Sequence, residues 1–147
     1  MDCSRRYGRP ALSGLAVLVV ACSSTTGLRT SQDILAHQAQ WINQGITSYS
    51  YTYEFTAYIS YAYRPLRLAV RQDTVRSVVD LATGDSINPA GFPTINGLFA
   101  YAISAAQRGT LSHIEFDAVR GYPSLVTYAV VPDGLSSQQA SALQPAP

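Results

Sequence analysis

Hydrophobic and polar residues alternate along residues 49–63. Odd positions carry mainly aromatic or aliphatic side chains, whereas most even positions carry Ser, Thr or Glu. A period of two places one row of side chains on one face of a β-strand. Apolar residues move to even positions after Pro65 and stay there up to Val70. This change of phase predicts a hairpin over residues 48–71, in which the odd-numbered tyrosines face the core.

Three further segments have the composition or alternation of strands. They follow turn signals such as Gln72-Asp73 and Arg120-Gly121-Tyr122-Pro123, and a loop rich in Gly, Pro and Asn separates the first of them from the others. The alternation predicts strands over residues 74–81, 111–117 and 124–131.

Helical spacing marks two segments. From Thr94 to Arg108, apolar residues recur every three or four positions, Thr94 can cap the start, and Gly109 follows the end. From Ser31 to Gln44 a weaker apolar stripe includes Trp41, with Ser31 as the expected N-cap. We expect Trp41 to be buried against the sheet, the alternative being an exposed platform for a ligand.

The order of these elements, α-β-β-β-α-β-β, predicts an α+β fold. We expect an antiparallel sheet of about five strands, a three-stranded meander plus a hairpin, covered by two helices. One domain would occupy residues 31–134. Residues 135–147, rich in Ser, Gln, Ala and Pro, have the composition of a disordered tail.

The first 21 residues have the pattern of a secretory signal peptide: a basic start, an apolar run over residues 11–20, and a small residue at Ala21. That run is too short to span a bilayer. Val19-Val20-Ala21-Cys22 resembles the lipobox of bacterial lipoproteins, which implies cleavage before Cys22 and acyl chains on this cysteine. The alternative is an ordinary cysteine in an ordinary signal sequence.

Lipid attachment at Cys22 predicts an exported protein, anchored to the membrane of the bacterial cell envelope through its acyl chains. Residues 22–30 would form a flexible tether. Because Ser23 and not aspartate follows the cysteine, the outer membrane facing the periplasm is the expected site in a diderm cell. Cys3 leaves with the signal peptide, so the mature chain has no disulfide.

The charges exclude one class of partner. The chain contains no lysine, and once residues 1–21 are removed, 7 arginines face 8 acidic residues. Such a chain has no basic surface for nucleic acid. It also lacks a phosphate-binding loop, a dinucleotide-binding motif and the cysteine spacing of a zinc site.

His113, Glu115 and Asp117 are the best chemical candidates, because alternate residues of a strand share one face and these side chains are metal ligands. A solvated strand face carries the same residues without function, so we assign no metal and no catalytic residue. Whether His37 faces the same region stays open. Tyr58 is out of phase with the other tyrosines and could contact a partner.

Five short motifs occur in order between Trp41 and Val131: Trp41 ahead of Gly45, Tyr49-x-Tyr51-x-Tyr53, Pro65 with Leu66-Arg67-Leu68-x-Val70, Thr94-Ile95-x-Gly97-Leu98-Phe99, and Gly121-Tyr122-Pro123. In this order they resemble a family of small bacterial lipoproteins and secreted proteins known only as a domain of unknown function. The resemblance implies the localisation and the fold, and supplies no catalytic residue. Members often carry a cysteine pair after the first strand, which residues 58–61 lack here, so no role of that pair transfers.

These observations predict a membrane-anchored module of the cell envelope with a binding or structural role, without enzymatic activity or a cofactor. A protein or glycan of the envelope is the expected kind of partner. The alternative is a small metal-binding protein or enzyme that uses His113, Glu115 and Asp117.

Overall fold

The computed structural model describes residues 25–57, 62, 64–131 and 134–146. They form two helices and seven strands, in the following order along the chain: α1 (Thr25–Asn43), β1 (Tyr49–Thr56), β2 (Leu66–Arg71), β3 (Thr74–Asp80), β4 (Ser86–Ile87), α2 (Ile95–Gln107), β5 (Leu111–Phe116), β6 (Pro123–Val131) and β7 (Gly134–Pro145).

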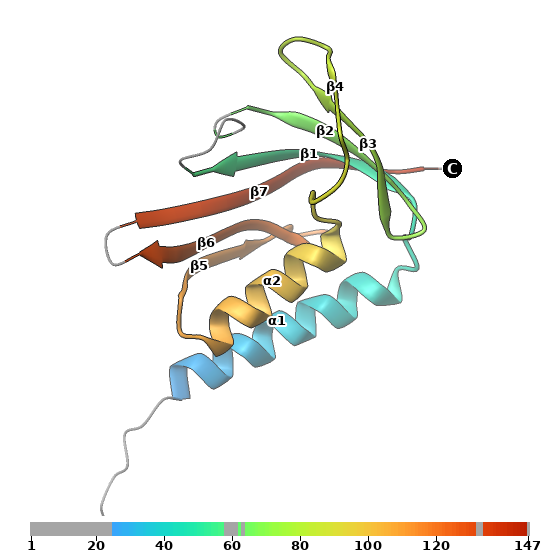
Figure 1. Cartoon of the computed structure of the whole chain (residues 1–147). Helices are drawn as coiled ribbons and strands as arrows, with labels where there is room; N and C mark the ends of the chain where they lie inside the picture. Colours follow the sequence, from blue (N-terminus) through green and yellow to red (C-terminus); the bar gives the residue numbers. More distant parts are fainter. Residues whose placement is uncertain (1–24, 58–61, 63, 132–133, 147) are drawn as a thin grey trace, which may run out of the picture.

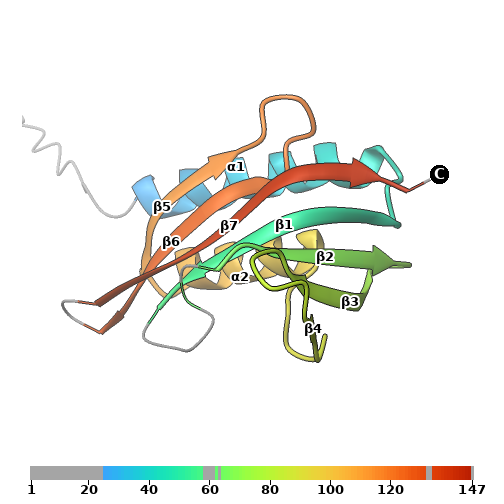
Figure 2. The ribbon, with the colours of Figure 1, turned by 90° about the horizontal axis from the view of Figure 1, so that it is seen from above.

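The strands form one antiparallel sheet in the order β4-β3-β2-β1-β7-β6-β5. The sheet curves around the helices, and both helices cover its concave face (Figures 1 and 2). The α+β class and the two covering helices are therefore confirmed. The expected number of about five strands was too low, because β4 and β7 have no clear alternation of apolar residues.

The prediction of a disordered tail over residues 135–147 was wrong. Residues 134–145 form β7, which lies in the middle of the sheet between β1 and β6. Its inward-facing residues Ser136, Gln138 and Ala140 are all buried. Two of these three residues are polar and the third is small, so the strand buries a face without showing a hydrophobic pattern. The domain consequently extends to Pro145 and does not end at residue 134.

The flexible tether over residues 22–30 also needs correction, because α1 begins at Thr25. Ser31 lies inside the helix and does not cap it. The side chain of Thr30 is half-buried, and it lines a small cavity together with Ile114 and Phe116 of β5. Packing against the sheet therefore favours helix at Thr30, ahead of the expected start.

The core agrees with the apolar patterns of β1 and α2, but on α1 the apolar residues Leu35 and Ile42 are exposed. Tyr49, Tyr51 and Tyr53 are 2%, 0% and 5% exposed, and they form one inward row along β1. Trp41 is buried with its ring edge-on to Tyr49, at a centroid distance of 5.5 Å, so its expected place in the core is confirmed. Thr94 caps α2 as expected, since its hydroxyl accepts a hydrogen bond from the Gly97 amide at 3.1 Å.

Gly121 lets the turn between β5 and β6 approach α1. Its φ of +73° is unfavourable for residues with a side chain, and an added Cβ would lie 2.6 Å from Oε1 of Gln40. The next residue, Tyr122, is buried and packs edge-on against Trp41, at a centroid distance of 6.1 Å. The turn therefore holds Tyr122 in the core.

We expect Gly121→Ala to lower the free energy of unfolding by about 1–2 kcal/mol, the cost of a left-handed conformation for an alanine. Gly97→Ala is the matched control, because Gly97 is helical and an added Cβ would make only ordinary contacts, the nearest at 3.4 Å from Cβ of Pro93. It should leave stability unchanged or raise it by up to about 1 kcal/mol. Urea unfolding of both variants measures the difference, and equal effects would contradict this account of the turn.

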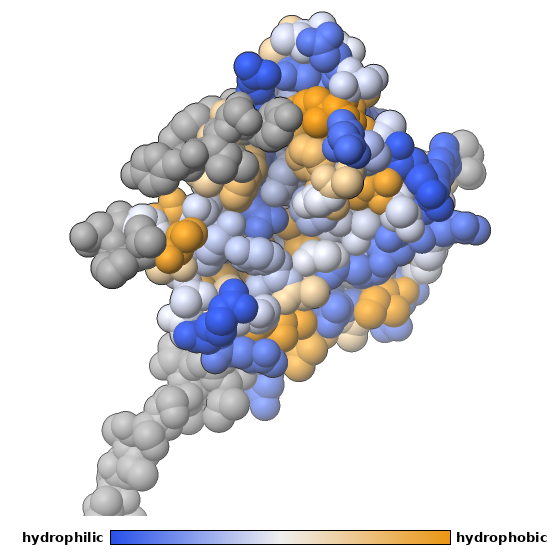
Figure 3. Space-filling view, in the orientation of Figure 1, coloured by the Kyte–Doolittle hydropathy of each residue, from blue (hydrophilic) through white to orange (hydrophobic). Residues whose placement is uncertain are grey.

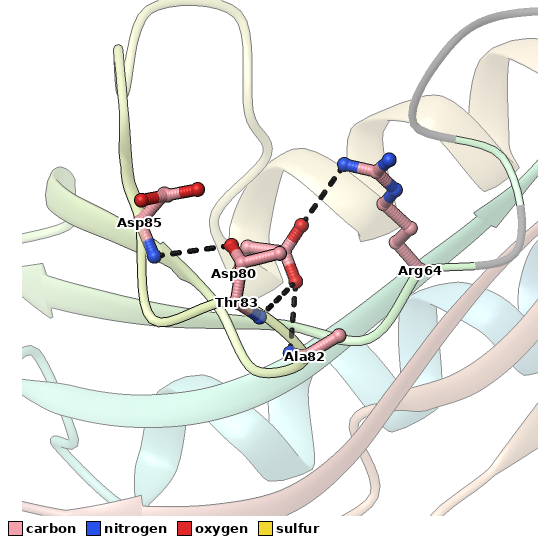
Figure 4. Close-up of polar contacts among 5 residues, drawn as sticks. All are labelled: Arg64, Asp80, Ala82, Thr83 and Asp85. Atoms are coloured by element: carbon pink, nitrogen blue, oxygen red, sulfur yellow. Dashed lines mark hydrogen bonds and ion pairs between the residues drawn. The ribbon is translucent and has the colours of Figure 1, made fainter.

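Asp80 organises the turn between β3 and β4 (Figure 4). Its side chain is 2% exposed, and Oδ1 accepts hydrogen bonds from the amides of Ala82 and Thr83 at 2.8 and 3.3 Å. Oδ2 lies 3.1 Å from Nη1 of Arg64. The Ala82 amide is the main cause that lowers the pKa of Asp80 below its ordinary value of 3.8, with help from Thr83 and Arg64 and against the effect of burial.

A lowered pKa means that the ionised form of Asp80 stabilises the fold. This contribution is present above the ordinary pKa of 3.8 and is lost as the pH falls through the lower pKa of the folded state. We expect Asp80→Asn to melt at a lower temperature at pH 7 and to lose less stability than the parent on acidification. Asp85→Asn makes the same charge change at an exposed position of this turn and should melt like the parent at pH 7. Melting curves between pH 7 and pH 2 test both expectations. If acidification lowers the melting temperatures of the parent and of Asp80→Asn by the same amount, this account of Asp80 is wrong.

Candidate functional site

A pocket of about 420 Å³ lies between the concave face of the sheet, helix α2 and the loop that joins β4 to α2. Its described lining is largely aromatic and carries no charged side chain. The lining comes from β1, β2, the loop, α2, β6 and β7, and consists of Tyr53, Phe55, Leu66, Ala90, Gly91, Phe92, Pro93, Tyr101, Tyr128 and Gln138.

Gln138 forms the polar floor of this pocket. It is 6% exposed, and its Oε1 accepts a hydrogen bond from the hydroxyl of Tyr53 at 3.1 Å. Its side chain also hydrogen-bonds Tyr128, which in turn contacts the hydroxyl of Tyr101. One buried amide thus links tyrosines from two strands, and through them a tyrosine of α2.

The floor is uncharged at neutral pH. Burial, with a hydrogen bond to Tyr101, raises the pKa of Tyr128 to about 12, although Gln138 and Ser136 partly oppose the shift. Burial is also the main cause that raises the pKa of Tyr53. Both hydroxyls therefore stay protonated and can donate hydrogen bonds, but they are poor bases.

Aromatic rings form the walls. Phe92 stands edge-on to Tyr53 at a centroid distance of 6.1 Å, and Tyr101 lies against Tyr128 at 4.7 Å. Tyr101 is 36% exposed, so it lies at the boundary between the pocket and solvent. Figure 3 shows this side of the molecule, where pale and orange residues lie between the helices and the upper strands.

The other two tyrosines of β1 position the wall of the pocket. The hydroxyl of Tyr49 accepts a hydrogen bond from the amide of Ile95 at 2.8 Å, at the start of α2. The hydroxyl of Tyr51 donates to the carbonyl of Pro93, which belongs to the pocket wall. The Tyr49-x-Tyr51-x-Tyr53 motif therefore has two roles: its first two hydroxyls hold the loop and α2, and the third faces the pocket.

The expected row of His113, Glu115 and Asp117 forms only in part. Nε2 of His113 lies 3.0 Å from Oε1 of Glu115, and both side chains are more than half exposed. Asp117 lies beyond the end of β5, and its Oδ1 accepts hydrogen bonds from the amides of Val119 and Arg120 at 3.1 and 2.7 Å. Asp117 thus shapes the turn before β6 and does not extend the row.

His37 lies on the concave side, away from His113. Its ring stacks on Phe116 at a centroid distance of 3.8 Å, and its Nδ1 is buried without a hydrogen-bond partner. In the part of the chain that the structure describes, no three or more His, Cys, Asp and Glu side chains come close enough to hold a metal ion.

Cys22 and Tyr58, the expected lipid attachment site and the possible contact residue, lie outside the described residues. Within the described ranges, neither helix has the combination of length and apolar character needed to cross a membrane.

The sequence did not indicate the pocket, because its lining residues come from six segments that meet only in the folded chain. The tyrosine row was predicted to be core, and at Tyr53 this row also forms a pocket wall. Nothing in the sequence indicated that Gln138 lines a site, since it belongs to a segment with the composition of a disordered tail.

Comparison with known proteins gives one match. The model of a family described as a family of unknown function (DUF6174) matches residues 33–128. This agrees with the resemblance to a domain of unknown function noted from the motifs, and the match stops before β7. No curated protein and no solved structure matches the chain.

Proposed function

The chain belongs to DUF6174, a family of unknown function, and we propose that it is a lipid-anchored module of the cell envelope that binds a small, neutral, largely apolar ligand in the tyrosine-lined pocket. Binding would leave the ligand chemically unchanged. The observation that carries the proposal is the uncharged polar floor formed by Gln138, Tyr53 and Tyr128 beneath aromatic walls.

The lining selects the charge of the ligand. An ion in this pocket would lose its hydration and find no opposite charge among the described lining residues, which is costly. A molecule with an apolar body would instead displace water from the rings of Phe55, Phe92 and Tyr101. A hydroxyl or amide N–H on such a molecule could donate a hydrogen bond to the hydroxyl oxygen of Tyr53, whose own proton is donated to Gln138. The volume of about 420 Å³ lies in the range of small-molecule sites.

The same lining argues against catalysis in the pocket. Its described residues include no His, Cys, Asp, Glu, Lys or Arg, and the buried tyrosines hold their protons. General acid–base or nucleophilic chemistry needs a group whose pKa lies near the working pH, or an activated nucleophile. The alternative of an enzyme or metal site on the outer strand face has only the His113–Glu115 pair as support.

Lipid anchoring at Cys22 rests on the Val19-Val20-Ala21-Cys22 motif at the end of the apolar run. A tethered binding module could meet ligands at the membrane surface, where largely apolar molecules are concentrated. Lipid attachment is tested separately from ligand binding, by the mass of the chain purified from membranes.

Ligand binding is tested by native mass spectrometry of the protein purified without denaturants. We expect an additional bound mass of a neutral organic molecule, and a loss of that mass in Gln138→Leu. If the variant loses two hydrogen bonds between the ligand and the floor residues, at about 1 kcal/mol each, the complex becomes roughly 30-fold weaker.

Gln139→Leu is the matched control for this experiment. The two glutamines are neighbours on β7, but Gln138 is buried at the pocket floor whereas Gln139 is exposed. The control should retain the bound molecule, and circular dichroism must show that both variants are folded. If no molecule is bound, and the parent also fails to bind an uncharged amphiphilic dye such as Nile red, the proposal is wrong.

A further inference from the structure

Two large apolar side chains on α1 face solvent. Leu35 is 50% exposed and Ile42 is 58% exposed, while the neighbouring Ile34 and Trp41 are buried. Leu35 and Ile42 are seven positions apart, two turns of an α-helix, so they lie on the same side of α1. Ala39 between them is exposed as well. We call this side the Leu35–Ile42 stripe.

The helices carry almost no charge near this stripe. Helix α2 contains no charged residue, and the part of α1 from Ile34 to Asn43 contains no Asp, Glu, Arg or Lys. Asp33 lines the cavity between α1 and β5 with His37 and Ile114, so it lies on a different side of the helix from the stripe. Orange residues are visible over the helices in the lower half of Figure 3.

Helix α1, which carries the stripe, begins close to the proposed anchor. Cys22 is three positions before Thr25, where α1 begins. Three residues reach about 10 Å at most, so an acylated Cys22 would keep the start of α1 within about 10 Å of the membrane surface. The 19 residues of α1 span about 28 Å. A helix of this length, held at one end, can lie along the surface.

We propose that the Leu35–Ile42 stripe is a membrane-docking surface, which inserts into the interface of the bilayer that holds the acyl chains of Cys22. This inference rests on the lipid anchor of the proposed function. Burial of exposed apolar side chains in the interface is favourable and needs no anionic lipid. Because the stripe contains no basic residue, docking should be as strong on zwitterionic lipids as on anionic lipids.

The experiment uses the full lipidated chain in vesicles of phosphatidylcholine alone. Since the mature chain has no thiol besides the acylated Cys22, Ile42→Cys introduces a single site for a nitroxide label. Leu81→Cys is the control, because Leu81 is 52% exposed and follows β3, in the turn that Figure 1 shows at the opposite end of the molecule from α1. Melting curves show that both labelled chains are folded.

We expect the label at residue 42 to collide with oxygen, which dissolves in the membrane, several-fold more than with a water-soluble nickel chelate, relative to the label at residue 81. Equal ratios at the two positions, with acyl chains present on Cys22, would overturn the docking surface and leave the anchor intact. Absence of acyl chains from the purified protein would overturn both. A label at residue 42 that is immobilised in native envelopes but water-exposed in vesicles would identify a protein partner and contradict membrane docking.

Discussion

A chain that ends at Val131 should not fold. Without β7, the sheet separates into β4-β3-β2-β1 and β6-β5, and the edges of β1 and β6 that β7 pairs with become free. Gln138 and Ala140 would no longer cover the core, and Tyr53 would lose its hydrogen-bond partner. We expect a loss of cooperative thermal unfolding and a low yield of soluble protein.

A chain that ends at Ala146 is the control, because it keeps all of β7 and the hydrogen bond from the Ala146 amide to the Ser48 carbonyl at 2.9 Å. It should melt at the same temperature as the 147-residue chain. Circular dichroism of both chains distinguishes a central strand from a dispensable tail. If the chain ending at Val131 melts cooperatively at the same temperature as the control, β7 does not hold the sheet together.

Replacing Phe99 by alanine should have the largest effect of any single substitution considered for this protein. Phe99 is 0% exposed in the second turn of α2, and its ring lies stacked near Phe116 of β5, at a centroid distance of 6.3 Å. Removal of a buried phenylalanine ring costs about 3–5 kcal/mol, since transfer energy and contacts are lost and a cavity remains. Domains of this size have a total stability of about 5–15 kcal/mol, so Phe99→Ala could leave the chain partly unfolded.

Ile42→Ala provides the comparison, because it also removes hydrocarbon from a helix but at a position that is 58% exposed. In the absence of membranes its effect should stay within about 0.5 kcal/mol. Urea unfolding of purified chains at 25 °C measures both changes. A Phe99→Ala variant as stable as Ile42→Ala would show that α2 does not pack on the sheet through Phe99.

Elements with a regular apolar pattern were predictable from the sequence. The tyrosines of β1 alternate with polar residues because one face of the strand is buried, and the stripe of α2 repeats because one side of the helix packs on the sheet. Periodicity therefore identified β2, β3 and α2 with boundaries within a few residues. It also gave the start of β1, but the alternation continues to residue 63, whereas β1 ends at Thr56.

Elements that bury small or polar residues were not predictable in this way. The inward side of β7 consists of Ser136, Gln138 and Ala140, and Gln138 is satisfied by tyrosines from other strands. Hydrogen bonds that form only in the folded chain compensate for the burial of such residues, and a hydrophobic pattern does not report them. β4 has two residues, too few for a pattern.

The candidate site was less predictable than the fold for the same reason. His113 and Glu115 were expected to share a face, and they contact each other. Asp117 was expected beside them, but its carboxylate is better satisfied by two amides of the following turn. The pocket depends on residues that are distant in sequence, so its shape and polarity follow from the tertiary structure alone.

The central place of β7 also affects how quickly the chain can fold. Tyr53 and Gln138, which share a hydrogen bond across adjacent strands, are 85 positions apart in the sequence. A distant pairing of this kind forms slowly, because a long loop must close before its contacts stabilise the chain. During synthesis, β1 has one unpaired edge until residues 134–145 become available. The nascent chain therefore stays incompletely folded until β7 has been made, which leaves it open to chaperones and to aggregation in that interval.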